Sequence, residues 1–367
     1  MKKFKSAALA FALAASLIGC SAAPSETPET KEASEAQNAS QTQEASQAQN
    51  ASEAQKSPET QETPVRVGSL KGPTSIGLVH MMEEDAEAGN YEFTMAAAAD
   101  ELLAADELLA SVVSEKLDIA LIPANVASVL YQKTEGQVSV IDINTLGVLS
   151  IISGDSSIAS WSDLAGKTVY LTGKGTTPDY VLQYLLKEHA SLDGFSPEDV
   201  TLEYKSEAAE IAVILKENPE AVGLLPQPFA TVAMSQNEAL QTVFDLTEEW
   251  DKLQTENNSR LVTGVTVVRN GFLEEHPEEV EAFLERHEES AKLALEEPDA
   301  TASLIVKTGI IEKEPIAKKA LPSCSIVFIE GNEMKDALSG YLEVLFEQDP
   351  KSVGGSLPGD DFYYGAK

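Results

Sequence analysis

Two short segments of this chain are alike, IPANVASV (Ile122–Val129) and LPQPFATV (Leu225–Val232). Each ends an apolar run with a proline and continues into small and apolar residues. The pattern predicts a strand that closes at the proline and is followed directly by a helix with a face of small residues. A strand followed by a helix is the building unit of α/β folds.

A second pair of similar segments occurs in the chain, and one member of it precedes each segment of the first pair. VGSLKGP (Val67–Pro73) and VYLTGKGTTP (Val169–Pro178) are each a strand, a turn with lysine and glycine, and a proline that opens a helix. Because both pairs occur in the same order, the sequence predicts two similar α/β lobes.

Strand and helix patterns alternate along both halves of the chain, which predicts βαβ units and mostly parallel sheets. Strands are predicted at Val65–Leu70, Tyr91–Ala96, Asp118–Ile122, Val138–Ile143, Lys167–Thr172, Val200–Tyr204, Ala221–Leu225, Gln241–Asp245 and Leu261–Arg269. Helices are predicted at Ser75–Glu84, Asp100–Lys116, Asn125–Gln132, Asp179–His189, Glu207–Glu217, Phe229–Gln236, Thr301–Thr308 and Asn332–Phe346, with a further long helix that Pro277 opens. Its apolar stripe is Val280, Phe283, Leu284, Ala291, Ala294 and Leu295. Crossings near Leu146–Ile152 and Leu261–Thr266 are predicted to join the lobes as a hinge.

The start of the chain has the pattern of an export signal. A lysine-rich start precedes an apolar run, Ala7–Ile18, which is too short to span a bilayer of about 30 Å. The run leads into LIGC (Leu17–Cys20), which resembles the bacterial lipobox. We expect residues 1–19 to be a cleaved signal peptide and Cys20 to carry lipid. The alternative is an ordinary secretory signal with an incidental cysteine.

Residues 20–63 have the composition of a spacer. An imperfect repeat, EASEAQNASQTQ (Glu32–Gln43) and EASQAQNASEAQ (Glu44–Gln55), contains no apolar residue larger than alanine. Such a segment cannot offset the roughly 1–2 kcal/mol per residue that ordering a backbone costs. We expect a disordered spacer between a lipid anchor and a folded body that begins at Pro64.

The charge and the cysteines exclude some functions. The chain has 60 Asp and Glu against 26 Lys and Arg, and nucleic-acid binding requires clustered cations, so we expect no nucleic-acid partner. If Cys20 carries lipid, only Cys324 remains, and no intramolecular disulfide can form. Cys324 lies in an apolar-flanked stretch and is expected to be a buried structural thiol.

The folded body resembles the type II periplasmic-binding-protein fold. Within it, the chain is most similar to solute-binding proteins of nitrate, taurine, aliphatic-sulfonate and thiamine-pyrimidine importers. The resemblance lies in LKGPTSIGL (Leu70–Leu78), DIALIPANVASVLY (Asp118–Tyr131), SDLAGKTVYL (Ser162–Leu171), GKGTTPDYVLQYLL (Gly173–Leu186), GLLPQPFATVA (Gly223–Ala233) and GGSLPGDDFYY (Gly354–Tyr364). It implies a small molecule held between two lobes and delivered to the permease and ATPase subunits of an ABC importer.

The resemblance and the lipobox together give a domain plan. Residues 64–148 form the first part of lobe I, residues 149–262 form lobe II, and residues 263–367 complete lobe I with C-terminal helices and a tail. We expect a monomeric extracytoplasmic lipoprotein, anchored to the cell membrane by its lipid, that needs no cofactor or metal.

The predicted ligand site lies at the carboxyl ends of the strands, where helices begin, as in other open α/β sheets. Helix N-termini there offer N–H groups and a partial positive charge to ligand oxygens. The predicted ligand-binding residues are Lys71, Gly72, Thr74, Ser75, Asn125, Lys174, Gly175, Thr176, Thr177, Gln227 and Phe229.

Two lysines in these turns predict an anionic or oxygen-rich ligand. Lys71 and Lys174 occupy similar places in the two lobes, and the alternative is that both point to solvent. Thr177, which precedes Pro178, fits an N-cap, so its hydroxyl is expected to be used by its own helix. Tyr204 is either an aromatic wall of the site or part of the lobe core.

Catalytic patterns are incomplete in this sequence. GKGTTP (Gly173–Pro178) is a partial dinucleotide-binding pattern in which proline replaces the third glycine. The sequence contains no G-x-S-x-G elbow and no histidine pair with metal spacing. His287 falls on an apolar helix face and is expected in the core. Related folds include thiamine-pyrimidine and menaquinone-pathway enzymes, but the cysteine-rich motif of the fungal thiamine enzyme is absent here. We expect no catalysis, and a lipoprotein sensor or adhesin remains the alternative.

Overall fold

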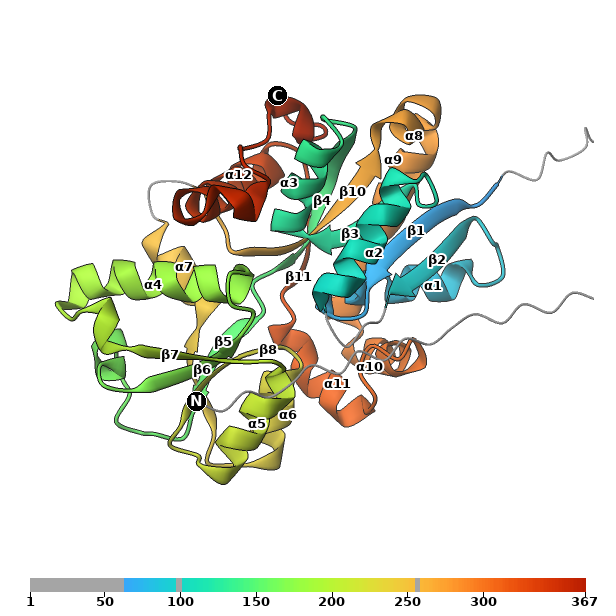
Figure 1. Cartoon of the computed structure of the whole chain (residues 1–367). Coiled ribbons are helices and arrows are strands. Elements are labelled where there is room, and N and C mark those ends of the chain that lie inside the picture. The colour runs from blue at the N-terminus through green and yellow to red at the C-terminus, as the bar shows by residue number, and fades with distance from the viewer. Residues whose placement is uncertain (1–62, 97–100, 255–257) are drawn as a thin grey trace, which may run out of the picture. The chain divides into compact units, whose positions relative to one another are not determined.

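Two β-sheets organise the part of the chain that the structure describes. In this computed structural model those residues are 63–96, 101–254 and 258–367. They belong to the unit Thr60–Lys367, and the predicted signal peptide, Cys20 and nearly all of the spacer lie outside the described residues. Figure 1 shows the sheets with helices on their faces.

The first sheet has six strands in the order β11-β4-β10-β3-β1-β2. The strands are β1 (Val65–Leu70), β2 (Tyr91–Ala96), β3 (Ile119–Pro123), β4 (Val138–Leu146), β10 (Val262–Arg269) and β11 (Ile326–Ile329). β1 pairs in parallel with β2 and β3, whereas β10 is antiparallel to β3 and β4, and β11 is antiparallel to β4.

The second sheet has five strands in the order β7-β6-β8-β5-β9. The strands are β5 (Leu149–Ser153), β6 (Thr168–Thr172), β7 (Thr201–Lys205), β8 (Val222–Pro226) and β9 (Gln241–Asp245). β6 is parallel to β7 and β8, and β5 is antiparallel to β8 and β9.

The predicted two-lobed α/β fold is confirmed, but the sheets are mixed where the sequence predicted mostly parallel ones. β5 and β10 run against both of their neighbours in the sheets that they enter. Each follows a passage from the other sheet, so each starts at the edge where its neighbours end. A strand that enters at that edge has to run antiparallel.

Helices cover the faces of both sheets. Those associated with the first sheet are α1 (Val79–Asp85), α2 (Glu101–Val113), α3 (Ala124–Lys133), α8 (Asn270–Glu275), α9 (Pro277–Glu296), α10 (Pro298–Lys307), α11 (Glu314–Ala320) and α12 (Gly331–Gln348). Those of the second sheet are α4 (Thr177–Asp193), α5 (Ala208–Glu217), α6 (Phe229–Gln236) and α7 (Leu246–Leu253). Short 3₁₀ helices include η1 (Pro73–Leu78), η2 (Trp161–Leu164) and η5 (Pro350–Val353). Among the described helices, none is both long and apolar enough to cross a membrane.

The apolar stripe of α9 shows how the helices are held. Val280, Phe283 and Ala294 are buried against the first sheet and its neighbouring helices, as the helical spacing predicts. Leu295, which the sequence placed in the same stripe, is 53% exposed, so this prediction was wrong. Ala294 already occupies the buried side of this turn, and the next residue is rotated by about 100° away from it.

The two passages between the sheets differ in length. The first is Gly147 and Val148, which lie between β4 and β5. The second runs from the end of α7 to the start of β10 at Val262, and residues 255–257 within it lie outside the described residues. The sequence placed this passage near Leu261–Thr266, but the ladder with β3 and β4 already holds the residues from Val262 onwards in a strand, and only Leu261 belongs to the passage.

Candidate functional site

The site predicted from the sequence lies where the two sheets meet. β1, β3 and β4 run in the same direction, so their carboxyl ends share one edge of the first sheet. β6 and β8 end at the edge of the second sheet where β5 begins, since Leu149 pairs with Pro226. Gly147 and Val148 connect these two edges directly. The loops that follow the strands therefore begin at the junction of the lobes.

The loop after β1 offers one free cation. The Ser75 side chain is fully buried and its hydroxyl donates to the Leu70 carbonyl at 2.5 Å. Thr74 is 7% exposed, and its hydroxyl lies 3.4 Å from the same carbonyl. Gly72 has an extended backbone with open space beside it. Lys71 is exposed, and within the described ranges its ammonium has no hydrogen-bond or ion-pair partner, so it is available to a ligand.

The loop after β6 is held by contacts of its own. Gly173 and Gly175 have φ values of 72° and 74°, in the left-handed region that favours glycine. Thr176 Oγ1 donates to the Gly173 carbonyl at 2.5 Å. The N–H of Gly175 donates to the Asp179 carboxylate at 2.7 Å and is not free for a ligand. Although the turns after β1 and β6 are alike in sequence, their backbones differ.

The lysine of the second loop lies against an aromatic ring. Lys174 is exposed, and its Nζ lies 5.2 Å from the centroid of the Tyr204 ring, within the range of a cation–π contact. Tyr204 is half-buried, and its hydroxyl donates to Asp179 Oδ1 at 2.7 Å. Burial and this carboxylate raise the pKa of Tyr204 well above its usual range, so the hydroxyl stays protonated.

The start of α4 differs from the prediction by one residue. Thr177 was predicted as the N-cap, but the N-cap is Thr176 and Thr177 is the first helical residue, so this prediction was wrong. Thr176 has the extended backbone of a cap (φ −127°, ψ −179°), but its hydroxyl closes the preceding turn and does not cap the helix. The hydroxyl of Thr177 instead donates to Asn125 Oδ1 at 3.4 Å.

This contact joins the lobes on one side of the junction. Asn125 lies in the first turn of α3 in lobe I, and Thr177 starts α4 in lobe II. Asn125 Nδ2 also donates to the carbonyl of Ser352, in the segment that follows α12, at 3.4 Å. Tyr180 of α4 adds a 3.0 Å hydrogen bond to Asp349 at the end of α12. On another side α11 packs against α6. The junction is thus bordered by contacts between lobes.

The last two predicted residues follow β8. Gln227 is 5% exposed; its N–H donates to the Val148 carbonyl at 3.0 Å and its Oε1 accepts the Thr231 hydroxyl at 2.8 Å. Gln227 therefore ties α6 to the first passage between the sheets. Phe229 is 38% exposed and presents part of its ring at the start of α6. Both residues remain predicted ligand contacts.

Sequence reasoning missed several residues at this junction. Asp179, Tyr180 and Asp349 organise the loop and the contact between lobes. The signal for Asp179 was present, because an acid at the third helical position is typical of a helix start, but that explanation needs no tertiary partner. Ser352 contributes only its backbone, which leaves no signal in the sequence.

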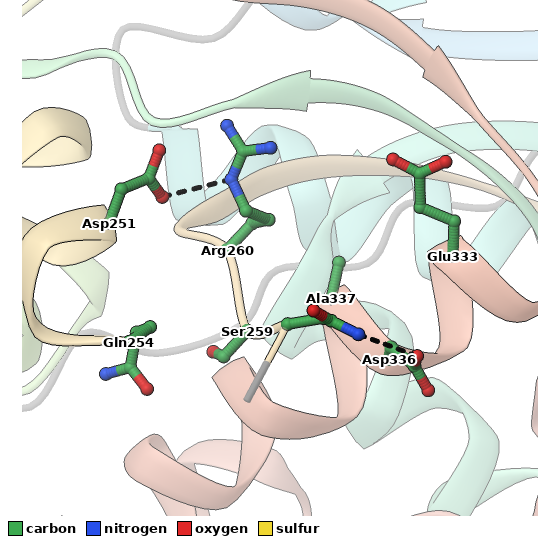
Figure 2. Close-up of a pocket in the computed structure, with 8 residues that line it drawn as sticks. Asp251, Gln254, Ser259, Arg260, Glu333, Asp336 and Ala337 are labelled. Atoms are coloured by element: carbon green, nitrogen blue, oxygen red, sulfur yellow. Dashed lines mark hydrogen bonds and ion pairs between the residues drawn. The ribbon is translucent and has the colours of Figure 1, made fainter. Parts of the chain in front are cut away.

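Two hollows on the surface lie away from the predicted residues. The first, of about 620 Å³, lies beside the second passage between the lobes (Figure 2). Its lining residues are Asp251, Gln254, Asn258, Ser259, Arg260, Glu333, Asp336 and Ala337. Arg260 Nε donates to Asp251 at 3.0 Å, so the one cation of its lining is already paired with an acid. The second, of about 440 Å³, is lined by residues of β2 and α2 and of the turn after α2. Neither lining includes a predicted site residue.

Cys324 and His287 occupy the core as predicted. Cys324 is fully buried, and burial raises the pKa of its thiol to about 12, so it is not a thiolate at neutral pH. The His287 side chain is fully buried and lies 3.2 Å from Asp142 Oδ2 through Nδ1. Cys324 packs among apolar side chains of α9, α10 and α11, and His287 of α9 contacts Phe328 and Asp142 of the first sheet.

Comparison with known proteins agrees with this fold. The two lobes define the type II periplasmic-binding-protein class. The sequence profile described as NMT1/THI5 like matches residues 105–301, which is more than half of the chain, and the chain belongs to this family. No curated protein sequence matches the chain significantly.

Solved structures share the fold at low sequence identity. An ABC-transporter protein from Parabacteroides distasonis is 23% identical, with a TM-score of 0.67 over 82% of this chain and 99% of that chain. The periplasmic aliphatic sulphonate-binding protein SsuA from Escherichia coli is 14% identical, with a TM-score of 0.61 over 80% and 95%. The nitrate-binding protein NrtA from Synechocystis is 15% identical, with a TM-score of 0.52 over 74% of both chains.

Proposed function

We propose that this chain is an extracytoplasmic solute-binding protein that captures a small anionic or oxygen-rich molecule between its lobes and delivers it to an ABC importer. The observation that supports this is the junction itself. The carboxyl ends of strands from both sheets meet at the two-residue passage Gly147–Val148, and loops of both lobes begin there. The family and the similarity in fold to sulfonate- and nitrate-binding proteins support the same proposal.

Lys71 is the group that best fits an anionic ligand, because its ammonium has no partner in the described part of the chain. Lys174 becomes available when it leaves the Tyr204 ring, a contact of about 0.5–1 kcal/mol at exposed sites. A charge-assisted hydrogen bond contributes roughly 1.5–3 kcal/mol. Lys71→Ala or Lys174→Ala should therefore weaken binding about tenfold to a hundredfold.

Mass spectrometry of molecules released from the purified protein identifies the ligand, and calorimetry with that molecule measures the variants. Lys205→Ala is the matched control, since Lys205 ends the neighbouring strand β7 but is paired with Glu203 at 2.6 Å. It should bind as the parent does. If Lys71→Ala and Lys174→Ala also bind as tightly as the parent, the ligand is not an anion, and Tyr204 and Phe229 become the expected contacts.

We also propose a lipid anchor at Cys20, which lies outside the described residues. A diacylglycerol contributes about 0.8 kcal/mol per buried methylene, enough for firm attachment, and the spacer then leaves the folded body free to reach a permease. Cys20→Ser should move the protein from the membrane fraction to the soluble fraction or leave it unprocessed. Detergent-phase partitioning that persists in Cys20→Ser would contradict the anchor.

A further inference from the structure

Asp179 is a buried carboxylate in the first turn of α4, next to the predicted binding loop. It is 3% exposed. Its Oδ2 accepts the N–H of Gly175 at 2.7 Å. Its Oδ1 accepts the Tyr204 hydroxyl at 2.7 Å and the Gln183 amide at 2.6 Å. Donors from the loop, from β7 and from α4 therefore meet on one side chain.

These donors connect the loop to rigid elements on both sides. β7, which carries Tyr204, pairs with β6, the strand that leads into the loop, and Leu171 lies opposite Tyr204 in this pairing. Gln183 lies one turn further along α4. Through Asp179 the middle of the loop is thus attached to the strand before it and the helix after it.

The backbone conformation of this loop is costly to order, and the attachment to Asp179 keeps it ordered. Gly173 and Gly175 both adopt left-handed conformations, and glycine loses more freedom on ordering than any other residue. Ordering the backbone costs about 1–2 kcal/mol per residue. If the loop were mobile, this free energy would reduce the affinity for every ligand that the loop binds. A buried carboxylate is also costly unless it is hydrogen-bonded, and Asp179 has donors on both of its oxygens.

We propose that Asp179 and Tyr204 are positioning residues that hold the Gly173–Thr177 loop in its binding shape before a ligand arrives. The inference rests on the proposed function, because the loop is one of the predicted walls of the ligand site. Tyr204 makes a second contact with the loop, because its ring forms the cation–π contact with the Lys174 ammonium. The pair therefore fixes the backbone of the loop and, until a ligand draws Lys174 away from the ring, the position of its cation.

Two variants of the full chain separate the parts of this arrangement. Tyr204→Phe removes one hydrogen bond to Asp179 and keeps the ring that contacts Lys174. Asp179→Asn removes the charge at almost constant volume. Tyr170→Phe is the matched control: Lys205 Nζ lies 5.3 Å from the Tyr170 ring centroid, and within the described residues the Tyr170 hydroxyl has no hydrogen-bond partner.

The first measurement needs no ligand. The amide exchange rate of Gly175, and the position of its amide signal in a ¹⁵N–¹H spectrum, report its hydrogen bond to Asp179. We expect exchange about tenfold faster in Asp179→Asn and about threefold faster in Tyr204→Phe, with no change in Tyr170→Phe. Exchange at the parent rate in both site variants would overturn the inference.

The second measurement distinguishes positioning from general stability. Calorimetry uses nitrate, taurine, methanesulfonate and a thiamine pyrimidine as probes. For a probe that the parent binds, Tyr204→Phe should weaken affinity about fivefold or more. Its melting temperature should equal that of the control Tyr170→Phe, so the loss of affinity does not come from a loss of stability. Faster exchange at unchanged affinity would make the contact merely structural and overturn the positioning role. A parent that binds none of the probes speaks against the proposed function, while the exchange rates still decide whether Asp179 holds the loop.

Discussion

Asp118 shows at the scale of one residue how charge stabilises lobe I. It is 3% exposed and accepts hydrogen bonds from Arg66 Nε at 2.8 Å and from Arg269 Nη2 at 3.0 Å. Burial alone would raise the pKa of Asp118, but these arginines hold it below its usual value. Its stabilising contribution is therefore complete above the unfolded pKa of about 3.9 and is lost as the pH falls through the folded pKa.

Asp118→Asn should accordingly lower the free energy of unfolding by about 1.5–3 kcal/mol near neutral pH. The difference from the parent should shrink as the pH falls from the unfolded pKa of about 3.9 through the lowered folded pKa, below which the parent carboxylate is protonated as well. Urea denaturation at a series of pH values from neutral downwards measures this. Glu203→Gln, which removes an exposed ion pair with Lys205, is the control and should leave stability unchanged. A pH-independent loss for Asp118→Asn would mean that its charge is not the cause.

Single residues were predictable from the sequence where their environment is local. The apolar neighbours of Cys324 and the helical stripe around His287 indicated burial, and both side chains are buried. The Tyr204 donor to Asp179 and the partners of Asn125 come from other elements, so no nearby pattern indicated them. Leu295 was predicted to be buried but is exposed. An apolar residue next to Ala294 in the sequence looks like part of the buried stripe even though its side chain points to solvent.

At the scale of elements, Gly147 limits the first passage between the sheets. A Cβ at this position would lie 2.2 Å from Thr247 Oγ1 and 2.7 Å from Leu261 Cδ2. Thr247 belongs to α7 and Leu261 to the second passage, so the two connections between the lobes pass each other at van der Waals distance. Only a residue without a side chain allows this approach.

Gly147→Ala should therefore destabilise the protein by about 1–3 kcal/mol, the usual cost of overpacking. Thermal unfolding measures it. Gly72→Ala is the matched control, because Gly72 has an extended backbone and no atom within 4 Å of an added Cβ. Equal stability of the two variants would show that the passages have room to separate.

Helices and strands with a clear hydrophobic period and flanking turn residues were predicted closely. Short helices and strands near the junction of the lobes were not. β1, β9 and α6 have the predicted bounds, since turn residues delimit each of them. β5 (Leu149–Ser153) overlaps the stretch Leu146–Ile152 that was predicted as a crossing, because its apolar residues are typical of any buried extended segment. α7 and α11 were missed; each is short and is stabilised by packing across elements.

At the scale of the molecule, α12 adds a contact between the lobes beyond the two passages of the chain. It packs on β4 in the first sheet and on α4 of lobe II. Tyr341 of α12 is fully buried, with its ring centroid 5.6 Å from that of Trp250 in α7. The sequence predicted a hinge of two extended crossings. It did not predict that α12 also connects the lobes, because this contact depends on packing between segments that are distant in the sequence.

Ligand-induced closure is the last prediction, and the hydrogen bond between Tyr180 and Asp349 makes it testable. Burial and the Asp349 carboxylate raise the pKa of Tyr180 to about 12, so this donor persists at neutral pH. A ligand that contacts both lobes should favour the closed arrangement and lower the radius of gyration in solution scattering. Tyr180→Phe removes a bond of about 1 kcal/mol, which should increase the radius without ligand and weaken ligand affinity about fivefold.

Tyr184→Phe is the matched control for this experiment. Tyr184 lies one turn further along α4, but its hydroxyl accepts a hydrogen bond from Gln254, at the end of α7, at 2.6 Å. Its loss should leave the scattering curve of the ligand-free protein as in the parent. If saturating ligand leaves the radius of gyration of the parent unchanged or increases it, the lobes do not close on the ligand. If Tyr180→Phe scatters like Tyr184→Phe, the contact at Asp349 does not hold the lobes together. An unchanged radius in the parent would mean a rigid hinge, with α12 and the closely packed passages at Gly147 as the structural reason.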